Sequence, residues 1–102
     1  MADSDGVTIT FERRLKPEAV ETFLNMRDEL VAGVSQMPGF RSIRIVQHRD
    51  DPARFLFVEH WDSEDDHKNY IAWRMQRGEL GGFKDATLSA ELNVWPNLVV
   101  KA

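Results

Sequence analysis

The chain has 102 residues, 42% of them hydrophobic and 29% charged, and we expect a single globular domain over residues 1–102. The formal net charge of −4 and the lack of a basic run argue against nucleic acid or an anionic membrane as a partner. The sequence contains no cysteine, which excludes disulfides, thiol nucleophiles and thiolate metal sites.

The beginning of the chain has neither the basic nor the apolar segment of a secretory signal. No apolar run approaches the roughly 20 residues that cross a bilayer. We therefore expect a cytoplasmic protein with no membrane partner. Residues 1–6 are small, polar and acidic, and we expect them to be disordered.

A strand and a helix open the domain. Apolar and polar residues alternate from Val7 to Phe11, which predicts a strand with one apolar face. Pro17 suits the first turn of a helix, and apolar residues recur at helical spacing from Val20 to Val34. We expect one amphipathic helix there, ended by Pro38-Gly39.

A hairpin follows. Residues 40–48 and 54–62 supply aromatic and β-branched residues on either side of the turn residues 49–53, which predicts two antiparallel strands. The second of these strands is apolar on both faces, so we expect it in the interior of a sheet. One of its faces carries Phe55, Phe57 and Trp61, and the other carries Leu56 and Val58.

A second helix begins directly after that strand. Ser63 is a suitable N-cap, and Asp66 three residues later fits a capping box with aspartate in place of glutamate. The acidic residues 64–66 favour the positive end of the helix dipole. One stripe of this helix carries His67, Tyr70, Ile71 and Arg74, with Trp73 at its flank.

The run from Glu59 to His67 is also rich in oxygen and nitrogen donors, which invites interpretation as a metal site. Strand alternation separates Glu59 from His60, and the helix dipole explains the acidic residues. We therefore expect no metal. The sequence lacks the Gly-x-Gly-x-x-Gly and Walker patterns, which are the fingerprints of nucleotide and flavin binding.

The end of the chain predicts one more strand. A short helix is expected to precede it, with the apolar residues Leu80, Phe83 and Leu88. Residues Glu91 to Trp95 predict the strand, and Pro96 marks it as an edge, a bulge or a crossing point. The apolar run from Leu98 to Val100 suits burial in an interface.

The predicted element order is β-α-β-β-α-β, a ferredoxin-like α+β fold with a four-stranded antiparallel sheet and helices on one face. The other face needs cover, because Val46, Leu56 and Val58 point to it. A symmetric homodimer that packs two sheets face to face supplies this cover. His60 alternates with Trp61 and faces the same interface, so we interpret it as structural.

Trp61 and His67 each allow two interpretations. Trp61 is either a large core aromatic under the helices or a flat wall of a pocket for an aromatic ligand. His67 is either a surface histidine or, facing inward, a general base for a phenol or an enol. Its place on one stripe with Tyr70 and Arg74 favours the inward position.

The segment from Phe55 to Arg74, preceded by Met37-Pro38-Gly39-Phe40, resembles the antibiotic biosynthesis monooxygenase family. The resemblance covers about Val7 to Trp95. It implies a dimeric α/β barrel, in which two ferredoxin-like sheets face each other and a pocket lies between each sheet and its helices. Several relatives oxidise quinols or aromatic polyketides with O₂ and no metal or flavin, a related branch degrades haem, and others handle small signalling molecules.

The family's functional residues are matched only in part. Trp61 corresponds to the strand tryptophan of the polyketide monooxygenases, but Phe57 stands where they have a strand asparagine. The tyrosine that they carry early in the second helix falls at or near His67, with Tyr70 one turn on. Haem degradation is disfavoured, because Tyr70 replaces the helical tryptophan of that branch and its histidine ligand has no convincing match.

The resemblance therefore implies a cofactor-independent monooxygenase for an electron-rich phenol, hydroquinone or anthrone. His67 is the expected base or proton shuttle, beside Trp61 as a catalytic residue. The expected substrate-binding residues are Tyr70, Arg74, Phe57, Trp73 and, as a weaker alternative donor, Asn25. The alternative function is a homodimer that binds a small aromatic molecule without chemistry, and the missing strand asparagine favours it.

Overall fold

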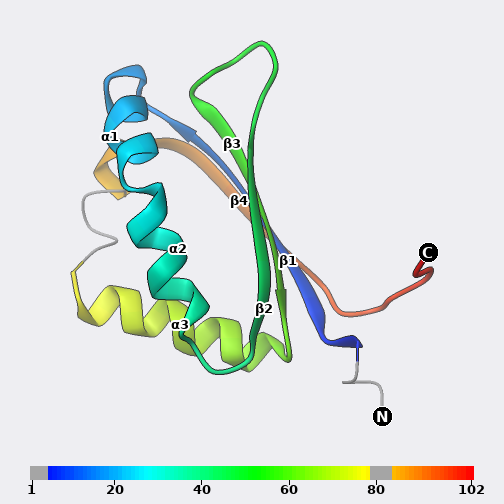
Figure 1. Ribbon diagram of the computed structural model, residues 1–102. Helices are drawn as coiled ribbons and strands as arrows, with labels where there is room; N and C mark the ends of the chain where they lie inside the picture. The colour runs from blue at the N-terminus through cyan, green and yellow to red at the C-terminus, as the bar shows by residue number, and fades with distance from the viewer. Residues whose placement is uncertain (1–4, 79–83) are drawn as a thin grey trace.

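The computed structural model describes residues 5–78 and 84–102, arranged as one sheet with helices on one side (Figure 1). The elements are β1 (Val7–Leu15), the 3₁₀ helix η2 (Pro17–Ala19), α1 (Val20–Asn25), α2 (Arg27–Ser35), β2 (Phe40–Gln47), β3 (Arg54–Trp61), α3 (Glu64–Gln76) and β4 (Thr87–Trp95). This arrangement confirms the predicted ferredoxin-like α+β fold. Of the expected disordered end, residues 1–4 lie outside the described residues.

The four strands form an antiparallel sheet in the order β2-β3-β1-β4. β3 pairs with both β1 and β2, which confirms its predicted interior position and the β2–β3 hairpin. β4 lies at an edge. Trp61 stands opposite Val7 on one side and Phe40 on the other, so these three residues share a face of the sheet.

The first helical segment differs from the prediction, because it is three short helices rather than one. The break lies at Met26, whose backbone N–H donates to the Phe23 carbonyl at 3.1 Å, one residue short of α-helical spacing. The Arg27 side chain satisfies the Leu24 carbonyl at 3.0 Å, next to the break. Phe23 and Val34 are both buried, so the apolar spacing continues across the break and conceals it in the sequence.

The segment before the last strand was predicted correctly only in part, since residues 84–86 are helical as expected but the helix ends before Leu88. Leu88 belongs to β4, which begins at Thr87 and pairs with β1 up to Trp95, with a shift of register next to Leu88, whereas a helix was expected there. Pairing of the backbone with β1 decides this conformation, since Ser89 and Ala90 supply little alternation of their own. Leu80 and Phe83 lie outside the described residues.

Two clusters of buried side chains fill the space between sheet and helices. The phenylalanine cluster consists of Leu15, Phe23, Phe55 and Phe57, with the Phe23 and Phe55 ring centroids 4.8 Å apart. The tryptophan cluster consists of Val7, Ile9, Val34, Trp61 and Tyr70. Among the described residues, the buried polar and charged side chains are Glu59, His67 and Arg74, and all three contact the tryptophan cluster.

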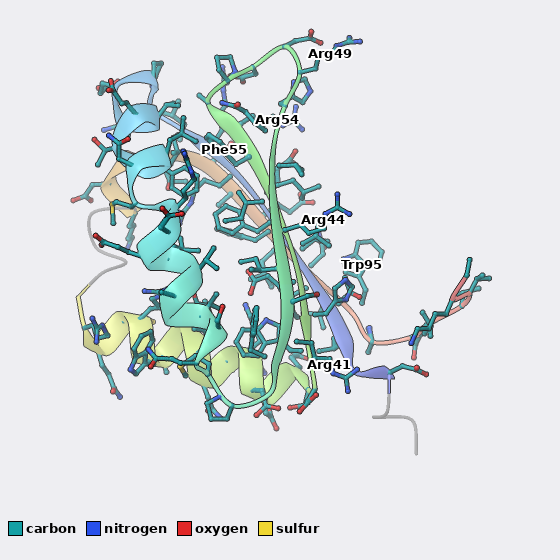
Figure 2. The ribbon with its side chains drawn as sticks, in the orientation of Figure 1. Arg41, Arg44, Arg49, Arg54, Phe55 and Trp95 are labelled. Carbon is teal, nitrogen blue, oxygen red and sulfur yellow. The ribbon has the colours of Figure 1, made fainter. Side chains whose placement is uncertain are left out.

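The sheet face that points away from the helices carries exposed apolar side chains. Figure 2 shows Phe55 directed to the helices and Trp95 and Arg44 on the opposite side of the sheet. Val46, Leu56 and Trp95 are 44%, 37% and 57% exposed. Leu98, Val99 and Val100 are exposed as well. Within the described residues, no helix has the length and hydropathy needed to cross a bilayer.

Candidate active site between the sheet and helix α3

The junction between β3 and α3 brings the candidate residues together. Alternation along β3 directs Phe57, Glu59 and Trp61 to the helix side, where all three are buried. The Ser63 hydroxyl oxygen accepts the backbone N–H of Asp66 at 3.2 Å, which confirms Ser63 as the N-cap of α3. Because the helix starts so soon after the strand, its first turns lie directly over Trp61.

Two inward residues of α3 pack against the Trp61 ring. The Tyr70 ring stacks on Trp61 with centroids 5.4 Å apart and planes at 30°. The His67 ring meets the Trp61 indole edge-on at 5.7 Å. His67 is only 4% exposed, which confirms the prediction that it faces inward rather than solvent.

Arg74 crosses from α3 to α2. Its Nε donates to the Tyr70 hydroxyl at 3.0 Å, and its Nη2 donates to the Leu30 carbonyl at 2.9 Å. The guanidinium lies 5.2 Å from the ring centroids of both Tyr70 and Trp73. Gly33 leaves room for this arrangement, since a Cβ there would stand 2.7 Å from Arg74 Nη2. A fixed positive charge therefore lies among aromatic rings.

Glu59 is a buried carboxyl group, 5% exposed, at the centre of this arrangement. Its Oε1 accepts the indole N–H of Trp61 at 3.0 Å, and His67 Nε2 lies 3.9 Å from the same oxygen. Burial raises the pKa of Glu59, while the Trp61 hydrogen bond and the Arg74 charge oppose that shift. Burial lowers the pKa of His67, against a smaller opposite influence of Glu64.

The Glu59–His67 contact is therefore not a salt bridge in the usual sense. Each group is shifted toward its neutral form, and 3.9 Å exceeds the length of a hydrogen bond. The sequence interpretation considered Glu59 only as a metal ligand. An acidic residue at an inward position of an interior strand is the signal that could have identified it, because such a carboxyl group must be buried.

A cavity of about 310 Å³ lies between the sheet and helices α2 and α3. Six residues that define its chemistry are Phe11, Phe57, Glu59, Tyr70, Trp73 and Arg74. A larger hollow of about 690 Å³ borders β4 and the end of α3, and it is far more open. We place the candidate site in the smaller cavity, because a buried carboxyl group and four aromatic rings from the sheet and α3 converge on it.

Residues 6–73 match the family described as antibiotic biosynthesis monooxygenase, which is more than half of the chain. The chain belongs to this family. No curated protein has a significantly similar sequence. The antibiotic biosynthesis monooxygenase fold recurs in solved structures of low sequence identity, and these likenesses show the fold alone.

Three such structures are similar over nearly the whole chain. An antibiotic biosynthesis monooxygenase is 19% identical with a TM-score of 0.80, covering 92% of this chain and 99% of the other. A conserved protein from Methanosarcina mazei Go1 is 17% identical with a TM-score of 0.79, covering 92% and 94%. SnoaB, a cofactor-independent oxygenase from Streptomyces nogalater, is 16% identical with a TM-score of 0.75, covering 89% and 91%.

In this antibiotic biosynthesis monooxygenase domain, the structure divides the expected site residues into three groups. Phe57, Tyr70, Trp73 and Arg74 line the cavity together. Trp61 and His67 contact the lining residues Glu59 and Tyr70 but do not line the cavity themselves. Asn25 is exposed at the end of α1 and is not a lining residue, so the structure does not bring it to the site.

Proposed function

We propose that this chain is a cofactor-independent monooxygenase that oxidises a small electron-rich aromatic compound, such as a quinol, phenol or anthrone, with O₂. The observation that supports this most is the enclosed cavity, where aromatic rings, the Arg74 guanidinium and the buried Glu59 carboxyl group converge. Family membership and the structural likeness to a cofactor-independent oxygenase agree with it.

In the proposed oxidation, the protein has to deprotonate the substrate and position it. The anion of a quinol or anthrone can give an electron directly to O₂, so the site must form that anion, orient it and exclude water. For an anthrone, the methylene group and O₂ become a carbonyl group and water, one oxygen atom entering each product. The substrate loses the four electrons that reduce O₂.

Each cavity residue has a role in this reaction. Tyr70, Trp73 and Phe57 hold the substrate ring, and Arg74 stabilises the oxyanion that develops on it. His67 serves as a proton shuttle behind the cavity wall, and Trp61 supports that wall from the core. No step requires a metal or a flavin.

An oxygen electrode tests this function with a panel of quinols and anthrones. For an anthrone we expect O₂ uptake above autoxidation, one O₂ consumed for each quinone formed, and no return of O₂ on adding catalase, since one oxygen atom enters the product and the other leaves as water. A quinol that is oxidised only to its quinone gives up two electrons, so its O₂ is reduced to H₂O₂ and catalase should return half of the O₂ consumed. Heat-denatured protein is the control for autoxidation. A rate equal to that control for every compound contradicts the proposal.

The second candidate function is a non-catalytic homodimer that holds a small aromatic molecule. It is favoured by Phe57, which gives the cavity an apolar ring where the polyketide monooxygenases have an asparagine donor. Native mass spectrometry that finds a retained aromatic ligand, together with no O₂ uptake on the panel, supports this function. A Soret shift on titration with haemin would instead indicate haem binding.

We infer that the protein works as a homodimer paired through the sheet faces. The exposed side chains of Val46, Leu56 and Trp95 on that face support this, since pairing would bury them. Sedimentation velocity at micromolar concentration is the test. A stable species at the 11.8 kDa of one chain contradicts the dimer and leaves the cavity chemistry unaffected.

A further inference from the structure

We propose that Glu59 is the general base of the cavity, with Trp61 as the residue that positions its carboxylate. This assignment rests on the proposed function for its substrate class, a hydroxyaromatic or enolisable compound. It replaces His67 as the group that meets the substrate proton.

Access distinguishes Glu59 from His67. Glu59 lines the cavity and His67 does not, although both are buried. A base must come within hydrogen-bond reach of the proton that it removes. In this geometry a ligand in the cavity meets the Glu59 carboxyl group before it meets the His67 imidazole.

The carboxylate is held at a fixed orientation. The Trp61 indole N–H donates to Oε1 at 3.0 Å, and the His67 ring occupies the space beside the same oxygen, with Nε2 3.9 Å away. We therefore assign the substrate proton to the second oxygen, Oε2. Trp61 is fully buried and packed by Phe40 and Tyr70, so its N–H is a rigid donor.

The surroundings of Glu59 favour uptake of a proton by its carboxylate. Burial raises the pKa of its carboxyl group, which makes the carboxylate a stronger proton acceptor than an exposed one. Arg74 of α3 opposes this shift, and burial keeps His67 largely neutral. The other titratable groups that line the cavity include Arg13 of β1, Glu29 of α2, Tyr70 of α3 and Arg77, which follows α3 directly.

The proton-transfer step is balanced without any redox change. The O–H bond of the substrate breaks heterolytically, its electron pair stays on the substrate oxygen, and the proton bonds to Glu59 Oε2. The resulting anion is the electron donor for O₂, which the proposed function already supplies. For an anthrone, the bond that breaks is the acidic C–H, and its electron pair becomes the enolate.

A chromogenic phenol tests this step without O₂ chemistry. We expect para-nitrophenol bound to the wild-type protein to show phenolate absorption at pH values where the free probe is neutral. In Glu59→Gln the bound probe should stay neutral, because the amide cannot accept the proton. Glu21→Gln, an exposed glutamate on α1, is the matched control and should behave like the wild type.

Two further variants separate the base from its neighbours. Trp61→Phe removes the donor to Oε1, and we expect the ionisation of the bound probe to shift in pH while still occurring. His67→Gln should leave the probe ionised. Ionisation that is lost in His67→Gln and kept in Glu59→Gln overturns the proposal, and so does a wild-type protein that fails to ionise or bind the probe.

Turnover gives a second measurement if the panel yields a substrate. Glu59→Gln should lower kcat by about 10²–10⁴-fold, the usual contribution of a general base, and should lose the acid limb of the pH profile. Absence of O₂ uptake in the wild type counts against the proposed function only. Full kcat with an unchanged acid limb in Glu59→Gln counts against the base.

Discussion

The two buried clusters of the core differ in the residue types that they contain. The phenylalanine cluster packs apolar side chains against one another, and its Phe23 ring lies 5.9 Å from that of Phe57. The tryptophan cluster instead surrounds Glu59, His67 and Arg74, which are all buried. Burial of apolar area stabilises a fold, whereas burial of ionisable groups costs free energy. We therefore expect the first cluster to supply stability and the second to supply chemistry.

Phe23→Ala is the strongest test of this division. Phe23 is 2% exposed, so the truncation should lower the free energy of unfolding by about 3–5 kcal/mol. Because Phe23 does not line the cavity, the fraction of the protein that remains folded should still ionise a bound phenol. Urea denaturation and the probe absorption measure the two effects.

Phe23→Leu keeps more of the volume and serves as the milder variant, in which the fold is retained. Loss of probe ionisation in folded Phe23→Leu, with little change in the urea midpoint, would contradict the division between the two clusters.

Arg74→Met has an intermediate effect and acts on the other cluster. Methionine keeps much of the aliphatic volume but loses the bonds to the Tyr70 hydroxyl and the Leu30 carbonyl. We expect a loss of roughly 1.5–3 kcal/mol in unfolding free energy, the range for hydrogen bonds to charged groups. The Arg74 charge also lowers the pKa of Glu59, so its removal should move the acid limb of probe ionisation to higher pH.

The distinguishing measurement for Arg74 is the pH dependence, because a merely structural role would change stability alone. Arg49→Met is the matched control, since Arg49 is exposed in the turn between β2 and β3 and does not line the cavity. An acid limb that moves equally in both variants would show that Arg74 has no special electrostatic role at Glu59.

The sequence predicted the sheet and its interior strand because alternation and turn residues act over short distances. Ser63, His67, Tyr70 and Arg74 were placed correctly on α3 for the same reason. The break at Met26 was missed because the apolar spacing continues across it, and the early start of β4 was missed because backbone pairing with the distant strand β1 decides it. Periodicity also could not show that Glu59 lines the cavity and His67 does not. It predicts which face of a strand or helix a side chain lies on, but not its distance from a cavity.

Glu59→Gln has the smallest expected effect on stability, since the amide keeps the volume and an acceptor for the Trp61 N–H. Burial raises the pKa of Glu59 in the folded state, so over the range above its ordinary pKa the unfolded chain binds fewer protons than the folded one. Wild-type stability should therefore fall as pH rises through that range, and Glu59→Gln should remove the fall.

The variant should thus be more stable than the wild type at pH of about 8 and similar to it at pH of about 4, near the unfolded pKa of glutamate. The lowered pKa of His67 has the opposite effect, a loss of stability as pH falls below about 6.5, but it is common to both proteins and cancels in the difference. Urea midpoints at the two pH values measure that difference. If the midpoint difference between the two proteins is the same at both pH values, the pKa of Glu59 is not raised in the folded state. The electrostatic argument for Glu59 as a strong base would then fail.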